Sequence, residues 1–231
     1  MKVRRLHAWT LDYAEAVAVQ ERLAGQVEQG PPLGEARTLA AADVSGGRRG
    51  DWIAAAVVLV DAGTMDVLEI RRAGMRARWP YVPGCLSFRE IPVVLKAFEG
   101  LRRRPDVVLC DGQGRAHPRR LGLASHLGLA LDVPTIGCAK SRLVGEVRGT
   151  LGRQRGSRAP LVDGGERIGT VLRTRTGVKP LYVSVGHRID LASAERWVLA
   201  AATRYRLPEP SRLAHQAVTA TKKEHLRRGH P

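Results

Sequence analysis

Residues 107–114 read VVLCDGQG, and the arrangement of the rest of the chain can be worked out from them. The four apolar residues predict a short buried strand over residues 107–110, with Asp111 at its carboxyl end. Ligand sites of open α/β sheets form at the carboxyl ends of parallel strands, which makes Asp111 a candidate functional residue. Asp111-Gly112-Gln113-Gly114 also has the composition of a tight turn, so a purely structural role for this aspartate stays open.

Apolar residues at helical spacing flank this strand. They run from Ile91 to Leu101 on one side, where Arg104-Pro105 ends the helix, and over residues 118–131 on the other, with Pro118 in the first turn. A further short strand is predicted over residues 135–138. Because the loops between these elements are short, the strands are expected to be parallel neighbours joined by right-handed crossovers.

The part of the chain before these elements predicts an antiparallel meander. Strands are expected over residues 38–44, 52–60 and 67–75, and residues 45–51, SGGRRGD, have the composition of a hairpin turn between the first two. Three antiparallel strands that lead into parallel strands with intervening helices are the order of a ribonuclease H-like sheet. The predicted fold class is therefore α/β, with a ribonuclease H-like mixed sheet flanked by helices.

The two ends of the chain complete the predicted domain. A single domain covering residues 1–231 is expected, with a basic, flexible tail at about residues 221–231. The remaining elements are a helix over 11–27 with Thr10 as N-cap, a hairpin of 168–173 and 181–185, a helix over 191–202 capped by Asp190, and a last helix after Pro210.

The composition points to a polyanionic partner. The chain has 231 residues, with 38 Lys and Arg against 22 Asp and Glu, and a formal net charge of +16. Coding in a GC-rich genome explains arginine in place of lysine, but it does not explain the excess of positive charge. Such an excess in a globular chain favours nucleic acid as the partner.

Neither a membrane span nor a zinc site is expected. No stretch approaches the roughly 18 apolar residues that a spanning helix needs, and residues 1–10 lack the apolar run of a signal peptide. The three cysteines, Cys85, Cys110 and Cys138, are an odd number without a CxxC pair. They are expected to be reduced thiols in a cytoplasmic protein.

Asp43 is the expected partner of Asp111. It lies in the first predicted strand within residues 40–44, AAADV, where an unpaired carboxylate is costly. If the two strands are neighbours, two carboxylates about 5 Å apart repel each other by roughly 3 kcal/mol at an effective dielectric constant of about 20. A divalent cation removes that penalty, and oxygen ligands select Mg²⁺ or Mn²⁺ over zinc.

Two further features have both a structural and a functional interpretation. Ser87-Phe88-Arg89-Glu90 matches a capping box, but Pro92 favours a helix start nearer Glu90, which frees that carboxylate for the sheet edge. Residues 79–84, WPYVPG, form a stiff loop that presents Tyr81, in a chain with only 4% aromatic residues. The ring either caps the core or enters a base stack as a wedge.

The combination of these motifs resembles the endonuclease V family, the deoxyinosine 3′ endonucleases. PYVPG, LSFRE and DGxGxxHPRR are specific together, whereas a single GxG or SxxE is weak evidence. The resemblance covers roughly residues 10 to 215 in family order. The matching stretches are residues 42–44 (ADV), 80–84 (PYVPG), 86–90 (LSFRE), 111–114 (DGQG), 117–120 (HPRR), 124–126 (ASH), 134–137 (PTIG), 139–140 (AK), 186–188 (GHR) and 207–210 (LPEP).

The resemblance implies a Mg²⁺-dependent hydrolase, with Mn²⁺ able to substitute. It would cleave the second phosphodiester bond 3′ to a deoxyinosine and leave 3′-hydroxyl and 5′-phosphate ends. Its partner would be DNA containing deoxyinosine, bound by a monomer, with inosine-containing RNA open as a second substrate. Another ribonuclease H-like nuclease, such as a junction resolvase or an excision-repair incision domain, fits the carboxylates equally well but not PYVPG and HPRR. A binding module without catalysis is disfavoured, because Asp43, Glu90 and Asp111 are all present.

The resemblance also assigns residue roles. Asp43, Glu90, Asp111, Lys140 and His215 would be catalytic, with Asp43 and Asp111 as direct metal ligands and with Glu90 and His215 acting through water. Lys140 would lie near the scissile phosphate. The remaining roles are a DNA wedge of Pro80, Tyr81, Val82 and Pro83, a base pocket of Gly84, Leu86 and Gly112, and phosphate contacts from Arg89, His117 and Arg119.

Overall fold

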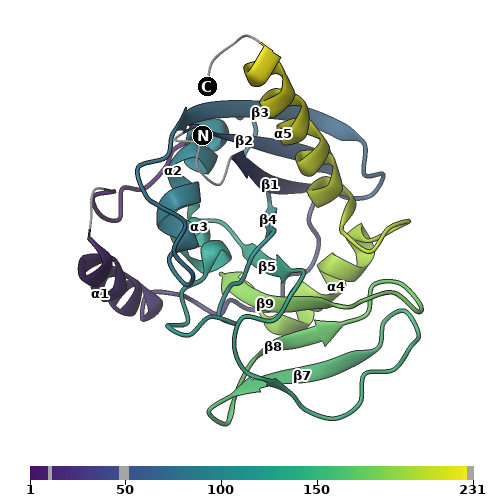
Figure 1. Ribbon diagram of the computed structural model, residues 1–231. Coiled ribbons are helices and arrows are strands. Elements are labelled where there is room, and N and C mark those ends of the chain that lie inside the picture. The colour runs from purple at the N-terminus through teal and green to yellow at the C-terminus, as the bar shows by residue number, and fades with distance from the viewer. Residues whose placement is uncertain (10–11, 47–51, 228–231) are drawn as a thin grey trace.

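The computed structural model describes residues 1–9, 12–46 and 52–227 (Figure 1). Within this part of the chain the strands form one mixed sheet in the order β3-β2-β1-β4-β5-β9-β8-β7-β6. The strands are β1 (Thr38–Gly46), β2 (Trp52–Asp61), β3 (Val67–Arg76), β4 (Val107–Cys110), β5 (Thr135–Ala139), β6 (Glu146–Val147), β7 (Arg158–Asp163), β8 (Glu166–Leu172) and β9 (Leu181–His187). The helices are α1 (Tyr13–Ala24), α2 (Leu86–Glu99), α3 (Leu123–Leu131), α4 (Leu191–Ala201) and α5 (Glu209–Arg227).

The centre of the sheet has the predicted strand order. β1 pairs antiparallel with β2 and β2 with β3, although residues 47–51, most of the predicted turn, lie outside the described residues. β4 pairs parallel with both β1 and β5. In the β1–β4 pair Ala42 lies opposite Cys110, so Asp43 and Asp111 come next on adjacent strands. The predicted ribonuclease H-like order is confirmed.

Helices cover both faces of the sheet. α2 and α3 pack on one face, over an apolar core that includes Val57 and Val108. α4 and α5 pack on the opposite face, over a second core that includes Val58 and Leu109. Neighbouring residues of one strand enter different cores because successive side chains point to opposite faces. Figure 1 shows these two helix layers on either side of β1, β4 and β5.

The segment after β4 departs from the prediction. α3 begins at Leu123 rather than at Pro118, so a long loop precedes it. Arg120 adopts a φ of 57°, which is outside the right-handed helical region. Gly122 packs so closely that an added Cβ would lie 2.2 Å from the carbonyl oxygen of Gln113. The loop therefore folds back on the edge of the sheet instead of starting a helix.

The start of α2 also differs. The helix begins at Leu86, after Cys85, and contains Pro92, so the expected start nearer Glu90 is wrong. The N-cap residue is Cys85, whose side chain makes no capping hydrogen bond, so the capping box led by Ser87 is wrong as well. The carboxylate of Glu90 is consequently available to the sheet edge, although for a different reason from the one expected.

Contacts at the chain ends explain two further differences. Asp12 caps α1 and forms a capping box with Glu15, whereas the predicted cap, Thr10, lies outside the described residues. α5 continues into the segment expected as a flexible tail, up to the end of the described residues. There the ring of His225 stacks on Trp52 with the centroids 3.6 Å apart, which holds the end of the helix against the sheet.

The second half of the sheet supports the loop that follows β4. The predicted β8–β9 hairpin and the helix capped by Asp190 are confirmed, whereas β6 and β7 were not predicted. At the β7–β8 turn, Glu166 accepts hydrogen bonds from Arg115 at 2.6 Å and Arg120 at 2.7 Å. Asp163 accepts a bond from Arg120 at 2.9 Å. These ion pairs fix the loop before α3.

The cysteines have no chemical role that the structure reveals. All three are free and buried, as expected for reduced thiols. Burial raises the pKa of Cys110 to about 12, so its thiolate is not populated at neutral pH. None of the helices in the described part of the chain is long and apolar enough to cross a membrane.

Candidate active site

Three carboxylates line one small cavity at the edge of the sheet. Asp43 comes from β1, Asp111 follows β4, and Glu90 projects from α2. The parallel β1–β4 pairing is what places Asp43 beside Asp111. The expected meeting of these three residues is confirmed.

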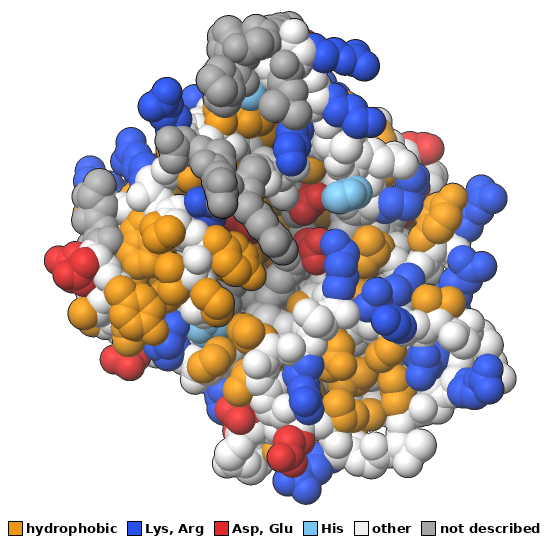
Figure 2. Space-filling model, viewed as in Figure 1, with side chains coloured by type: hydrophobic (Ala, Val, Ile, Leu, Met, Phe, Trp, Pro, Cys, Tyr) orange, Lys and Arg blue, Asp and Glu red, His pale blue; other side chains and the backbone are white. Residues whose placement is uncertain are grey.

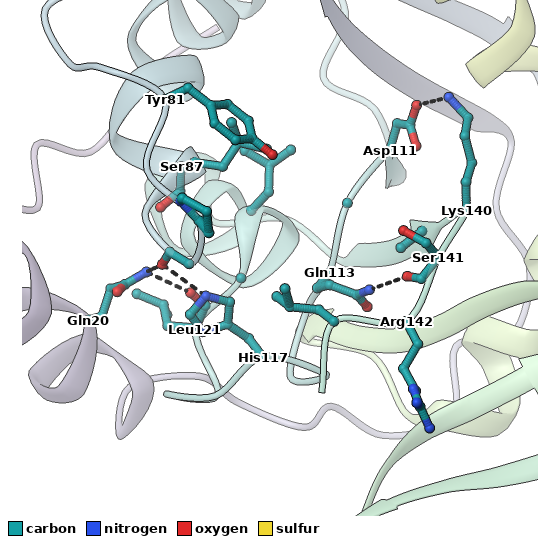
Figure 3. A pocket seen from close by; sticks show the side chains of 18 residues that line it. Gln20, Tyr81, Ser87, Asp111, Gln113, His117, Leu121, Lys140, Ser141 and Arg142 are labelled. Carbon is teal, nitrogen blue, oxygen red and sulfur yellow. Dashed lines mark hydrogen bonds and ion pairs between the residues drawn. The ribbon is translucent and has the colours of Figure 1, made fainter. Parts of the chain in front are cut away.

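Each aspartate has a partner that bears or can take up positive charge. Lys140, directly after β5, forms an ion pair with Asp111 (Figure 3). His215, on α5, places Nδ1 2.7 Å from Oδ2 of Asp43 and donates a hydrogen bond to it. The structure therefore brings together all five residues that were expected to be catalytic.

The carboxylates strongly affect one another. Burial raises the pKa of Asp43 and the charge of Asp111 adds to the rise, whereas the hydrogen bond from His215 opposes it. Burial also raises the pKa of Glu90 to about 8, with further contributions from Asp43 and Asp111. With these neighbours alone, Glu90 keeps its proton at neutral pH. A cation placed between the carboxylates would lower their pKa values again.

This donor set suits a hard divalent cation. Carboxylate oxygens are the ligands that Mg²⁺ prefers, and the two aspartates present them from adjacent strands. Among the described residues no group of three or more His, Cys, Asp and Glu side chains is arranged to hold an ion directly. Asp43 and Asp111 are the residues of this set that could hold such an ion.

A larger cavity of about 330 Å³ opens beside the carboxylates. Its wall includes Gly84, Leu86 and Gly112, the three residues expected to form a base pocket, as well as Asp111. Figure 3 shows Tyr81 on one side of this cavity and the Lys140–Asp111 pair on the other. The volume is at the lower end of the range of roughly 300–1,000 Å³ that small-molecule pockets occupy, which suits a single base.

The loop that carries Tyr81 has two aromatic residues, of which one lies in the core and the other faces solvent. Trp79 is buried and packs against Phe88, with the ring centroids 5.4 Å apart. Tyr81 is 69% exposed. The role of capping the core therefore belongs to Trp79, and Tyr81 is the ring that the loop presents outward.

The carbonyl oxygen of Gly84 is the anchor of this loop. It accepts hydrogen bonds from Gln20 Nε2 at 2.9 Å, His117 Nε2 at 3.0 Å and Arg119 Nη2 at 2.9 Å. Nδ1 of His117 accepts a bond from the Arg119 backbone, which leaves the ring proton on Nε2. Burial, with the nearby charge of Arg119, lowers the pKa of His117 to about 4, so this ring is neutral at pH 7.

Arg89 has a similar supporting contact, since its Nη1 donates to the carbonyl oxygen of Trp79 at 2.5 Å. The three residues expected to contact phosphates, Arg89, His117 and Arg119, are thus bonded to the main chain around the Tyr81 loop. Gln20, which is buried on α1 and joins this network, was not predicted from the sequence. The only sign of Gln20 in the sequence is a polar residue on the apolar side of a predicted helix. This pattern does not indicate which groups its side chain bonds to.

The strand order and the carboxylates on adjacent central strands define the class of the protein as a ribonuclease H-like nuclease. The chain belongs to the endonuclease V family, whose profile matches residues 21–216. The members of this family are DNA repair endonucleases and therefore hydrolases. The resemblance found in the sequence is confirmed.

Curated relatives match almost the whole chain. Endonuclease V of Rhodospirillum centenum is 55% identical over 90% of this chain and 88% of its own length. Endonuclease V of Methanothrix thermoacetophila is 52% identical over 93% of this chain and 94% of its own.

Solved structures show the same fold. Endonuclease V of Streptomyces avermitilis is 44% identical with a TM-score of 0.89, covering 98% of this chain and 100% of that one. Endonuclease V of Ciona intestinalis, in complex with a 24mer DNA containing an inosine followed by a ribo-adenosine, is 25% identical. Its TM-score is 0.81, and the match covers 91% of this chain and 98% of that one.

Proposed function

We propose that this protein recognises deoxyinosine in DNA and hydrolyses the second phosphodiester bond 3′ to it, with Mg²⁺ as cofactor. The observation that carries the proposal is the position of the carboxylate cluster directly beside a base-sized cavity. Asp111 lines both spaces, so a base held in the cavity places its own strand across the carboxylates. Products with 3′-hydroxyl and 5′-phosphate ends follow from water attack that expels the 3′ oxygen.

Asp43 and Asp111 would hold the metal directly, and Glu90 and His215 would act through water. The bound ion, Mg²⁺ or Mn²⁺, would supply charge for the scissile phosphate and lower the pKa of an attacking water. His215 fixes the orientation of Asp43 through its 2.7 Å hydrogen bond. Glu90 lines the same small cavity as the two aspartates, which places its carboxylate where it could hold such a water.

Lys140 adds a charge from the protein itself. Its ammonium group is within reach of the cavity and of Asp111, on a side chain that is 44% exposed. A phosphate that enters the site offers this cation a second partner. Positive charge at that position stabilises the negative charge that accumulates on the phosphate during hydrolysis.

Base selection belongs to the cavity and to the loop beside it. Gly84, Leu86 and Gly112 offer mainly backbone groups, and a tight pocket of this kind disfavours guanine by leaving its exocyclic amino group crowded and unpaired. Tyr81, held within the stiff segment of Pro80, Val82 and Pro83, would fill the gap that the extruded base leaves. Arg89, His117 and Arg119 would support this loop through the contacts described above.

Cleavage of matched duplexes with and without one deoxyinosine, in Mg²⁺ and in EDTA, tests the proposal. We expect one metal-dependent cut, at the second bond 3′ to the lesion, and mapping of both product ends identifies it. A protein that cuts both duplexes equally, or cuts in EDTA, contradicts the proposal. Inosine-containing RNA is a further arm of the same assay, and symmetric four-way junctions test the resolvase alternative.

The same proposal takes the enzyme to be a monomer that works in the cytoplasm as one domain over residues 1–231. Light scattering of the free protein and of its complex with an inosine duplex checks the oligomeric state.

A further inference from the structure

The α4–α5 loop, residues 202–208, meets the active site at Lys140, on the side of the sheet that α4 and α5 cover. α4 and α5 lie on one face of the sheet, whereas the cavity is lined from α1, from the start of α2 and from the loops after β4 and β5. The carboxylates lie at the sheet edge between these two sides. Glu90 reaches the carboxylates from α2 and His215 reaches them from α5. A strand that leaves the cavity across the carboxylates can therefore pass from one helix layer to the other, toward the start of α5 and the loop before it.

Arg206 ties this loop to Lys140, and the following helix carries His215. Arg206 Nη2 donates to the carbonyl oxygen of Lys140 at 2.9 Å and to that of Pro180 at 2.7 Å. At the other end, Arg212 precedes His215 by three positions on α5, so the two residues lie on neighbouring turns of the same helix face. The loop is thus fixed to the element that carries Lys140 and continues into the helix that carries His215.

Tyr205 organises two guanidinium groups at this place. The guanidinium carbon of Arg212 lies 5.0 Å from the centroid of the Tyr205 ring, and that of Arg204 lies 5.6 Å from it. Glu209 binds Arg212, with a 2.9 Å bond to its Nε, and so neutralises it. Arg204 is exposed, and within the described part of the chain no carboxylate lies within 4.0 Å of its guanidinium group, although the charge of Glu209 acts on it from farther away. Its charge is oriented by the ring and is available to a ligand.

We propose that the α4–α5 loop binds the nucleic-acid strand on the 3′ side of the scissile bond, with Arg204 contacting a backbone phosphate. The inference rests on the proposed function, which defines the direction of the strand. An arginine held on an aromatic ring suits this task, because its planar guanidinium matches phosphate oxygens and loses little freedom on binding. Figure 2 shows Lys and Arg side chains gathered beside the paired acidic and histidine side chains on this face.

The test is binding to inosine duplexes of two designs, measured in EDTA so that no cleavage occurs. Both designs have the same long 5′ flank, and the 3′ flank ends either one nucleotide or ten nucleotides beyond the cut. For Arg204→Gln we expect roughly tenfold weaker binding of the long design and a salt slope smaller by about 0.9. Binding of the short design should be unchanged. Tyr205→Phe keeps the ring and should bind both designs like the wild type.

Arg103→Gln is the matched control. Arg103 is an exposed arginine between α2 and β4, so this variant loses the same charge at a place away from the strand. The inference is overturned if Arg204→Gln binds like Arg103→Gln, if it weakens both designs equally, or if its effect follows the length of the 5′ flank. Failure of the proposed function looks different: the wild type would then bind duplexes with and without deoxyinosine equally well.

Discussion

At the scale of single residues, the site keeps two negative charges together by giving each aspartate its own partner. Lys140 pairs with Asp111 and His215 with Asp43. The two partners are 44% and 63% exposed, so water screens both pairs and they contribute little to stability. Their placement is better explained by the proposed reaction, in which a phosphate would take Lys140 as its partner and a metal ion would take the two aspartates.

Asp43→Ala and Asp111→Ala are each expected to abolish cleavage and to leave binding of inosine DNA largely intact. The physical reason is that each variant removes one of the two groups that would hold the metal directly. Turnover in Mg²⁺ and the dissociation constant in EDTA measure the two effects separately. Glu35→Ala, which removes an exposed carboxylate elsewhere, is the control. Wild-type turnover by either aspartate variant would rule out the assignment.

Tyr81→Ala is expected to weaken discrimination for inosine in duplex DNA by roughly tenfold to a hundredfold. The exposed ring supplies stacking worth about 1–3 kcal/mol where the base has left the helix. Tyr81→Phe should be nearly silent, because stacking needs the ring and not the hydroxyl group. Cleavage of single-stranded and double-stranded substrates, together with a thermal melt, provides the measurement.

The melting temperature of Tyr81→Ala should stay close to that of the wild type, because the side chain is 69% exposed and Trp79 fills the core. An equal loss of activity on single and double strands would defeat the wedge, since a single strand has no stack to fill.

At the scale of elements, a directional chain of hydrogen bonds joins the N-terminal segment to α2 and α3. Nδ1 of His7 lies 2.5 Å from the carbonyl oxygen of Ala8, so it carries the proton and leaves Nε2 as an acceptor. Nε2 of His126 donates a hydrogen bond to Nε2 of His7 at 2.8 Å. Nδ1 of His126 accepts a hydrogen bond from the Ser87 hydroxyl at 3.1 Å. This pattern requires both rings to be neutral.

Stability is therefore expected to fall as the pH falls below about 6.5. Burial, with the charge of His7, lowers the pKa of His126 to about 3, whereas the unfolded chain takes up this proton near pH 6.5. The stabilisation that the neutral His126 ring contributes is fully present above the pKa of the unfolded chain. It is lost progressively as the pH falls from that value toward the pKa of the folded protein. Between pH 7 and pH 5 the loss amounts to about 2 kcal/mol for this group.

Denaturant unfolding at the two pH values checks this expectation, with His126→Gln as the comparison. Glutamine keeps a donor and an acceptor but does not titrate. The free energy of unfolding of the variant should therefore change less between the two pH values than that of the wild type, by about 2 kcal/mol. Part of the dependence remains, because the pKa of His117 is also lowered, to about 4. An identical pH dependence of variant and wild type would refute the role of His126.

The central elements were predictable from the sequence because their signals are local. The apolar run of residues 107–110 and the helical spacing after Ile91 both reflect burial that each segment must satisfy. The start of α3 was not predictable, because Arg120 takes its left-handed conformation among ion pairs to the distant β7–β8 turn. β7 alternates between exposed and buried residues over its first four positions, but it contains Pro160, a residue that argues against a strand in a sequence, so its sequence gave no clear strand signal.

Some residues of the candidate site could likewise be predicted from the sequence, and others could not. Asp43 and Asp111 were predictable because a carboxylate in or directly after an apolar strand is costly unless it is paired or binds a metal ion. Gln20 was not, since its partner Gly84 lies 64 residues away and the bond depends on how α1 packs beside the Tyr81 loop.

At the scale of the whole molecule, the net charge of +16 predicts binding that depends steeply on salt. With about five phosphate contacts and a slope near −0.9 for each, affinity should fall roughly 500-fold between 50 and 200 mM salt. Titrations of duplex DNA at several salt concentrations measure the slope. A flat dependence would show that the charge is not used on nucleic acid.

The position of His215 on α5 has a consequence for protein synthesis. Asp43, Glu90 and Asp111 leave the ribosome early, but α5 also supplies Ala214 and Val218 to the core over β1 and β2. A nascent chain therefore has neither the full set of reacting groups nor a covered central sheet until that helix has been translated. A polypeptide that stops before α5 is therefore expected to be unable to cut DNA, so the proposed activity would be withheld from chains truncated at that point.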